Sequence, residues 1–170
     1  MRRKPIKREA SIITAPMGLT ILLTALYQVV ILGTLLYLMS YGWFLSEGTQ
    51  FKFWEDIRSL DNLEGLTVFF TAFVLFHFWN FFNCRSMRWG ESPFAMLFKN
   101  KVFLVIVVVI ALIQISIVQG SGYFGIGEIF RTTALELWQW IALALLTVTI
   151  IPAAYGIRYV VHLLGLYEKG

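Results

Sequence analysis

Charged residues are scarce in this chain, and none of them lies near the centre of an apolar stretch. Only 14% of the 170 residues are Asp, Glu, Lys or Arg, whereas 58% are hydrophobic. Soluble domains carry about 25% charged residues, so this composition excludes an ordinary soluble domain and predicts an integral membrane protein. The formal net charge of +4 is explained by membrane orientation, and we draw no inference of nucleic-acid binding from it.

Cysteine and the sequence signals of several site types are also lacking. The single cysteine, Cys84, allows no internal disulfide. The acidic loop at 46–66 lacks the alternation of oxygen ligands that a calcium loop needs. The glycine-rich GSGYFGIG at 120–127 does not lie between a strand and a helix, as a nucleotide loop requires. The sequence therefore gives no support for an internal disulfide, a calcium-binding loop or a nucleotide-binding loop.

Four apolar runs are long enough to cross about 30 Å of hydrocarbon as helices, at about 1.5 Å per residue. The predicted spans are residues 17–44, 67–83, 102–119 and 137–161. The predicted domains are a basic cytoplasmic segment at 1–16, a four-helix transmembrane domain at 17–166 and a tail at 167–170. The first span is too long for the apolar region of a signal peptide and lacks a small-residue cleavage site after it, so we expect it to remain. The predicted fold class is an all-α membrane protein.

Basic residues gather on alternate sides of the predicted spans. All of the 14 Lys and Arg residues except Lys52, Arg58 and Arg131 lie before the first span, between the second and third, or toward the end of the chain. Basic residues favour the cytoplasmic side of a membrane. The distribution therefore predicts that both termini are cytoplasmic, in agreement with an even number of spans.

The second span carries a stripe of metal-competent and hydrogen-bonding side chains. Four of these side chains lie within about a third of the helix circumference at about 100° per residue. They are His77, Asn80, Asn83 and Cys84. Polar groups in hydrocarbon are costly without partners, so this face should meet other helices or a wet cavity. His77 is either a packing histidine or a group that lines a cation path. Asn80 and Asn83 are either links between helices or oxygens near a cation, and Cys84 is interpreted as a small apolar filler.

Five segments carry a resemblance to a known family. They are KREASIIT, ALYQVVILGTLLYL, TVFFTAFVLFHFWNFFNCR, KNKVFLVIVVVIALIQISIVQGSG and LELWQWIALALLTVTIIP. The most specific pattern, FVLxxxxNxxNxR, is met by Phe73, Val74, Leu75, Asn80, Asn83 and Arg85. The chain resembles the C-terminal membrane part of P-type cation-transporting ATPases of the calcium-pump group, from the loop before their seventh helix through their tenth. The resemblance implies a bundle of four transmembrane helices that supports the ion-binding helices.

The resemblance implies participation in ATP-driven cation transport without catalysis by this chain alone. The DKTG and TGE motifs that such pumps use for phosphorylation and dephosphorylation are absent from the sequence. No cofactor is expected in this chain, whereas the complete pump would need ATP, Mg²⁺ and a transported cation, Ca²⁺. The expected partners are the lipid bilayer and the remaining helices and cytoplasmic head of the pump, with no nucleic acid. The expected location is the plasma (inner) membrane, as a multi-pass protein.

The resemblance also bears on the polar stripe. Two-ion calcium pumps carry a glutamate at the position that matches His77, and pumps similar to the plasma-membrane calcium ATPases carry an uncharged residue there. A neutral imidazole is a poor ligand for a hard cation, so we expect one ion per cycle in the parent pump. No metal ligand is assigned, and the candidate cation-proximal residues are His77, Asn80 and Asn83. Two alternatives stay open: a small membrane protein that assembles with or regulates a cation pump, and an independent four-helix carrier.

Overall fold

The computed structural model describes residues 15–59, 61–84, 100–123 and 126–164, and these residues form helices and turns without strands. The elements are α1 (Ala15–Met39), α2 (Phe53–Ser59), α3 (Leu63–Asn83), α4 (Lys101–Gln119), the 3₁₀ helix η2 (Gly120–Gly122), α5 (Ile126–Phe130), α6 (Leu137–Val148) and α7 (Ile150–Leu163). The stretches long and apolar enough to cross a membrane are Pro16–Met39, Leu63–Asn83, Lys101–Gly122 and Leu137–Leu163. The predicted all-α class with four spans is confirmed. Residues 1–14 of the predicted basic segment at 1–16, Arg85 and the tail at 167–170 lie outside the described residues.

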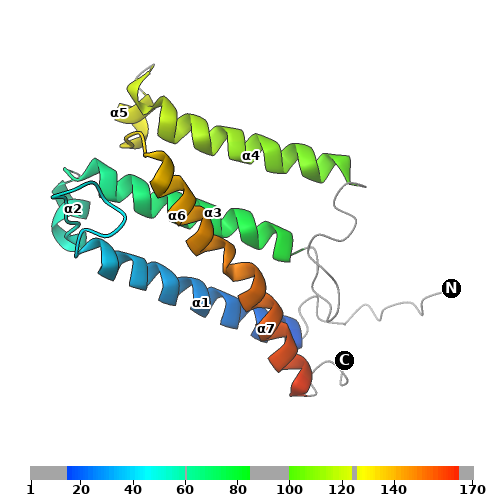
Figure 1. Ribbon diagram of the computed structural model, residues 1–170. Helices are drawn as coiled ribbons and strands as arrows, with labels where there is room; N and C mark the ends of the chain where they lie inside the picture. The colour runs from blue at the N-terminus through cyan, green and yellow to red at the C-terminus, as the bar shows by residue number, and fades with distance from the viewer. Residues whose placement is uncertain (1–14, 60, 85–99, 124–125, 165–170) are drawn as a thin grey trace.

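Helix α3 is the centre of the bundle. It contacts α1, α4, α6 and α7, and α1 also packs along α7. Figure 1 shows that α1 and α4 begin, and α3 and α7 end, at one end of the bundle, whereas α2 and α5 lie at the other end. Hereafter the first is called the terminal end and the second the loop end. The helix with the polar stripe is therefore the helix with most neighbours, as polar groups in a membrane require.

Helix α1 ends at Met39 rather than at the predicted Phe44. The backbone at Gly42 has a φ of 84°, and Phe44 has a φ of 68°. A left-handed backbone is accessible to glycine at little cost and ends a helix. A Cβ at Gly42 would also lie 2.9 Å from the carbonyl oxygen of Thr49. The predicted span was too long because residues 40–44 are largely apolar, and their composition therefore does not show that the helix has ended and that the backbone turns there.

Two helices begin at asparagine caps. The Asn62 side chain accepts a hydrogen bond from the Gly65 backbone N–H at 2.9 Å, and Asn100 accepts from the Phe103 backbone N–H at 3.1 Å. A side-chain oxygen at this position satisfies a backbone donor that has no partner inside the helix. Asn62 thus starts α3 at Leu63, before the predicted start of this span at residue 67.

The last span is broken into α6 and α7 at Thr149. Pro152 accounts for the break because proline has no N–H for the helical hydrogen bond and its ring crowds the preceding turn. Neighbouring helices hold this region: Tyr27 of α1 donates to the Thr149 hydroxyl at 2.8 Å, and Trp79 of α3 donates to the Thr147 hydroxyl at 3.1 Å. The proline break is thus fixed by contacts to two helices.

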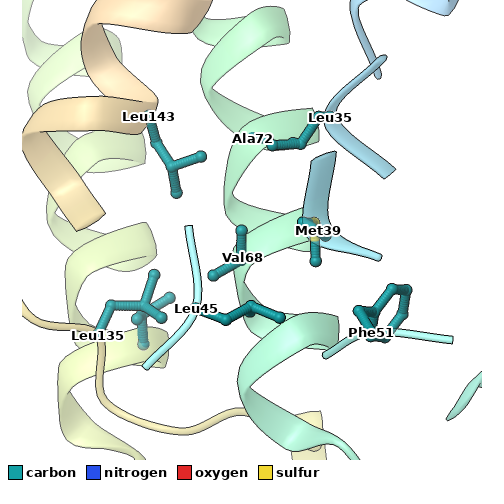
Figure 2. Close-up of a cluster of buried hydrophobic side chains, with 9 residues drawn as sticks. Leu35, Met39, Leu45, Phe51, Val68, Ala72, Leu135 and Leu143 are labelled. Carbon is teal, nitrogen blue, oxygen red and sulfur yellow. The ribbon is translucent and has the colours of Figure 1, made fainter. Parts of the chain in front are cut away.

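A buried apolar cluster joins the helices toward the loop end (Figure 2). Its members are Leu35, Met39, Leu45, Phe51, Val68, Ala72, Val118, Leu135 and Leu143. Phe51 belongs to the loop at 46–66 and is only 1% exposed, so part of this loop is core rather than a solvated connection. Its ring lies so close to Gly65 of α3 that a Cβ there would overlap it.

Candidate functional site

The polar stripe of α3 divides between two cavities. Asn80, Asn83 and Cys84 line a cavity of about 500 Å³ between α1, α3 and α7. His77 instead lines a cavity of about 150 Å³ between α3 and α4. His77 is exposed, and its ring makes an edge contact with Phe73, with ring centroids 4.4 Å apart. The structure therefore brings the two asparagines together and separates the histidine from them.

The separation follows from the position of His77 at the edge of the predicted arc. At about 100° per residue, His77 lies about 40° from Phe81 and about 60° from Val74 around the helix. Both of these residues line the smaller cavity, together with Val107 and Ile110 of α4. The sequence placed four polar residues on one arc, but it held no signal for which neighbouring helix meets each edge of that arc.

Helix α1 contributes polar side chains to the larger cavity. Thr20, Thr24 and Gln28 all line it, because residues four apart share a helix face. The hydroxyl of Thr20 donates to the Pro16 carbonyl oxygen, and that of Thr24 to the Thr20 carbonyl oxygen, both at 2.8 Å. The Nε2 atom of Gln28 is buried without a hydrogen-bond partner among the described residues. Gln28 therefore offers the cavity a donor.

Asn83 offers the cavity an acceptor. The residue is 6% exposed, and its Nδ2 donates to the Ile150 carbonyl oxygen at 3.4 Å. Its Oδ1 is buried and has no partner in the part of the chain that the structure describes. Since a carbonyl oxygen faces the amide nitrogen, the amide oxygen is the atom left for a further contact.

Arg158 brings a positive charge to the same cavity. It lies in α7, is 3% exposed and lines the cavity. Its Nε donates to the Ala154 carbonyl oxygen at 3.2 Å, and its guanidinium carbon lies 5.9 Å from the centroid of the Tyr155 ring. The distribution of basic residues along the sequence predicts only that Arg158 lies toward the cytoplasmic end. Arg158 follows the buried Ala154 by four residues, and Ala154 follows the buried Ile150 by four. Because residues four apart lie on the same face of a helix, this spacing indicates that Arg158 is buried with them.

Cys84 lies where α3 ends, at the rim of this cavity. The residue is exposed at this rim, and the desolvation of its thiol by the neighbouring helix ends raises the pKa of the thiol, since desolvation disfavours the thiolate. A raised pKa favours the neutral thiol over the more reactive thiolate. As the only cysteine of the chain, it can report on the cavity without an added label site.

The family of the chain follows from comparison with known proteins. Residues 1–160 match the family described as "Cation transporting ATPase, C-terminus". The chain belongs to this family. The resemblance stated from the sequence segments is thereby confirmed.

Several relatives of known name are similar to this chain. The Arabidopsis thaliana protein named calcium-transporting ATPase 8, plasma membrane-type, is 31% identical over 141 residues, which are 83% of this chain and 12% of the relative. The Caenorhabditis elegans plasma membrane calcium-transporting ATPase mca-1 is 33% identical over 141 residues, which are 83% of this chain and 10% of the relative. The Homo sapiens plasma membrane calcium-transporting ATPase 1 is 33% identical over 146 residues, and the match covers 82% of this chain and 11% of the relative. The chain thus spans about a tenth of the length of these relatives.

Membership of this family does not by itself show that a cation binds at the polar stripe of α3. Among the described residues, no group of three or more His, Cys, Asp or Glu side chains is arranged to hold a metal ion. Asn80 and Asn83 supply oxygens of the kind that hard cations accept, but Arg158 lines the same cavity and its charge repels a cation. The cation-proximal role of His77, Asn80 and Asn83 stays a prediction for the complete pump.

Proposed function

We propose that this chain is the C-terminal membrane portion of a P-type calcium-transporting ATPase of the plasma membrane, where it supports the ion-binding helices during ATP-driven transport. The observation that carries the proposal is the family match over residues 1–160. The names of the similar proteins support calcium as the cation and the plasma membrane as the location. The remaining helices and the cytoplasmic head, which bind ATP and Mg²⁺, are then the partners. No observation favours a free-standing regulator of a pump over this function.

The exposed apolar surface of α1 fits a supporting role. Large side chains exposed on this helix are Ile21, Leu22, Leu26, Val29 and Val30. In a membrane, such a surface meets either lipid or further helices, both of which are apolar. Helix α1 also lacks charged residues between Pro16 and Met39. It can therefore pack against the helices that precede it in a complete pump without burying a charge.

Complementation tests the proposed function. The chain is coexpressed with the head and first six helices of its own pump, and calcium uptake driven by ATP is measured in membrane vesicles. We expect uptake and an acid-stable phosphoenzyme only when both parts are present, because the chain lacks the DKTG motif. Each part alone is the control. Uptake or phosphorylation by the chain alone contradicts the proposal, as does failure of the two parts together under conditions in which the uninterrupted pump is active.

The orientation of the bundle is a separate prediction. We expect the terminal end to face the cytoplasm because most basic residues lie on that side of the spans. In a Cys84→Ser background, Asp61→Cys should react with a membrane-impermeant thiol reagent from outside intact cells, and Lys101→Cys should react only after permeabilisation. Both positions are exposed. The reverse labelling pattern would contradict the orientation while leaving the four spans unchanged.

A further inference from the structure

We propose that α2 is a membrane-interface anchor, which lies along the lipid interface at the loop end with Trp54 and Ile57 among the lipids and Glu55 and Ser59 in water. Such an anchor is independent of transport and requires only that the four spans cross a membrane. In Figure 1, α2 lies at the loop end, where α1 ends and α3 begins. The partner is therefore the lipid surface of the leaflet at that end.

The loop before α2 returns to the level at which the spans end. The backbone N–H of Phe51 donates to the carbonyl oxygen of Met39, the last residue of the first membrane-length stretch, at 3.1 Å. Asn62, which caps α3, donates through Nδ2 to the Gln50 carbonyl oxygen at 3.0 Å. Because α2 begins at Phe53, two residues after Phe51, at most about 7 Å separate its start from this level. Lipid headgroups occupy a layer about 5–8 Å thick beyond the hydrocarbon, so α2 starts at headgroup depth.

Contacts of Phe53 and Asp56 fix which side of α2 faces the bundle. Oδ2 of Asp56 accepts hydrogen bonds from the Lys52 backbone N–H at 2.7 Å and from Nδ2 of Asn62 at 3.3 Å. Phe53 is half-buried and packs against the buried cluster that Figure 2 shows. Residues three apart lie on one face of a helix, and α2 is held to the bundle by this face. The other side chains of α2 are exposed.

The side chains of α2 divide into an apolar flank and a polar flank. At about 100° per residue, Phe53, Ile57 and Trp54 span an arc of about 100°. The rest of the circumference is polar, and its residues are Glu55, Asp56, Arg58 and Ser59. An amphipathic helix of this kind lies along a membrane interface with its apolar side toward the lipid. The apolar flank begins at the bundle with Phe53, so Ile57 and Trp54 continue the apolar surface outward from the core.

Lipid is the partner that the apolar flank fits. Trp54 is 73% exposed and Ile57 is 39% exposed, and covering apolar surface is favourable. A stable protein–protein interface uses about 20–30 residues a side, far more than two side chains supply. Tryptophan favours the membrane interface, where its ring meets both apolar chains and polar headgroups. The loop at 46–66 holds five acidic and two basic residues, so its attraction to lipid is apolar rather than electrostatic.

The anchor fixes the depth of the first two spans in the membrane. Phe51 joins the loop to the end of α1, and Asp56 joins α2 to the cap of α3. Interfacial aromatic residues set how deeply a helix lies in the bilayer and how it is rotated. Because of these two hydrogen bonds, α1 and α3 are held at a depth that α2 determines.

Fluorescence quenching tests the anchor. The full chain, in a Cys84→Ser background, carries a bimane label at Ile57→Cys or at Ser59→Cys and is reconstituted into phosphatidylcholine nanodiscs. The two positions are a matched pair, since both are exposed on α2 and lie about 160° apart around the helix. We expect a nitroxide near the lipid headgroup to quench the label of Ile57→Cys about threefold more than that of Ser59→Cys, and aqueous iodide to give the reverse order.

Leu26→Cys is the control for a membrane span. Leu26 is 57% exposed near the middle of α1, so a nitroxide near the end of the acyl chain should quench its label more than one near the headgroup. Trp54→Cys should behave as Ile57→Cys, and neither substitution removes buried packing because both residues are exposed. Equal quenching of Ile57→Cys and Ser59→Cys by the lipid nitroxide overturns the proposal. So does a label at Ile57→Cys that neither quencher reaches, because protein then covers the apolar flank.

Discussion

Replacing Gln139 with Leu should lower the free energy of unfolding of this chain by about 3 kcal/mol, because three hydrogen bonds of one buried side chain are lost. Gln139 is 1% exposed. Its Nε2 donates to the Phe44 carbonyl oxygen at 2.9 Å and to Oε1 of Glu64 at 2.7 Å, while its Oε1 accepts from the Glu136 backbone N–H at 2.8 Å. One amide thus ties the start of α6 to the turn after α1 and to the start of α3.

The expected loss exceeds that of an ordinary neutral hydrogen bond. The Glu64 carboxylate also accepts from the backbone N–H and the hydroxyl of Ser46, both at 2.8 Å. Leucine in place of Gln139 leaves this half-buried carboxylate with fewer donors, and it leaves the Phe44 carbonyl oxygen without its side-chain donor; unsatisfied buried groups are costly.

Thermal unfolding in detergent micelles, followed by circular dichroism, measures the effect. Gln50→Leu is the matched control, since it makes the same chemical change at an exposed loop position and should leave the midpoint within about 1 °C. Equal midpoints for Gln139→Leu and Gln50→Leu would show that the three hydrogen bonds contribute no net stability.

Substitution of Gly65 by Ala should destabilise the chain by about 1–3 kcal/mol, the usual range for overpacking a filled core. A Cβ at position 65 overlaps the ring of Phe51. The ring is 1% exposed and lies within the buried cluster of Figure 2. It has little room to move, so either the ring or α3 must shift to admit the methyl group.

Gly33 supplies a control with the opposite expected sign. It lies inside α1, and a Cβ there would meet nothing within 4 Å, so Gly33→Ala should stabilise the helix by about 0.5–1 kcal/mol. Gly65→Ala should cost less in a Phe51→Leu background, where the ring is absent. The clash is refuted if both glycine substitutions change the unfolding midpoint in the same direction, or if the cost of Gly65→Ala is unaffected by Phe51→Leu.

Composition and local chemistry determined the number of spans and several helix ends. A helix needs about 20 apolar residues to cross the hydrocarbon, so the four runs predicted four helices directly. Asn62 and Asn100 at the starts of α3 and α4 and Pro152 near the break of the last span also act through nearby backbone atoms. Such effects depend only on residues close together in the chain, and therefore they can be predicted from the amino-acid sequence.

Only the tertiary structure decided which side chains meet. The helices are apolar on nearly every side, because lipid is as apolar as the core, so hydrophobic periodicity does not mark the buried face. The burial of Arg158 and of Phe51, and the separation of His77 from Asn80 and Asn83, depend on where α1, α4 and α7 pack around α3. These contacts join residues far apart in the chain. Their energies come from packing and from hydrogen bonds between helices, which no local pattern specifies.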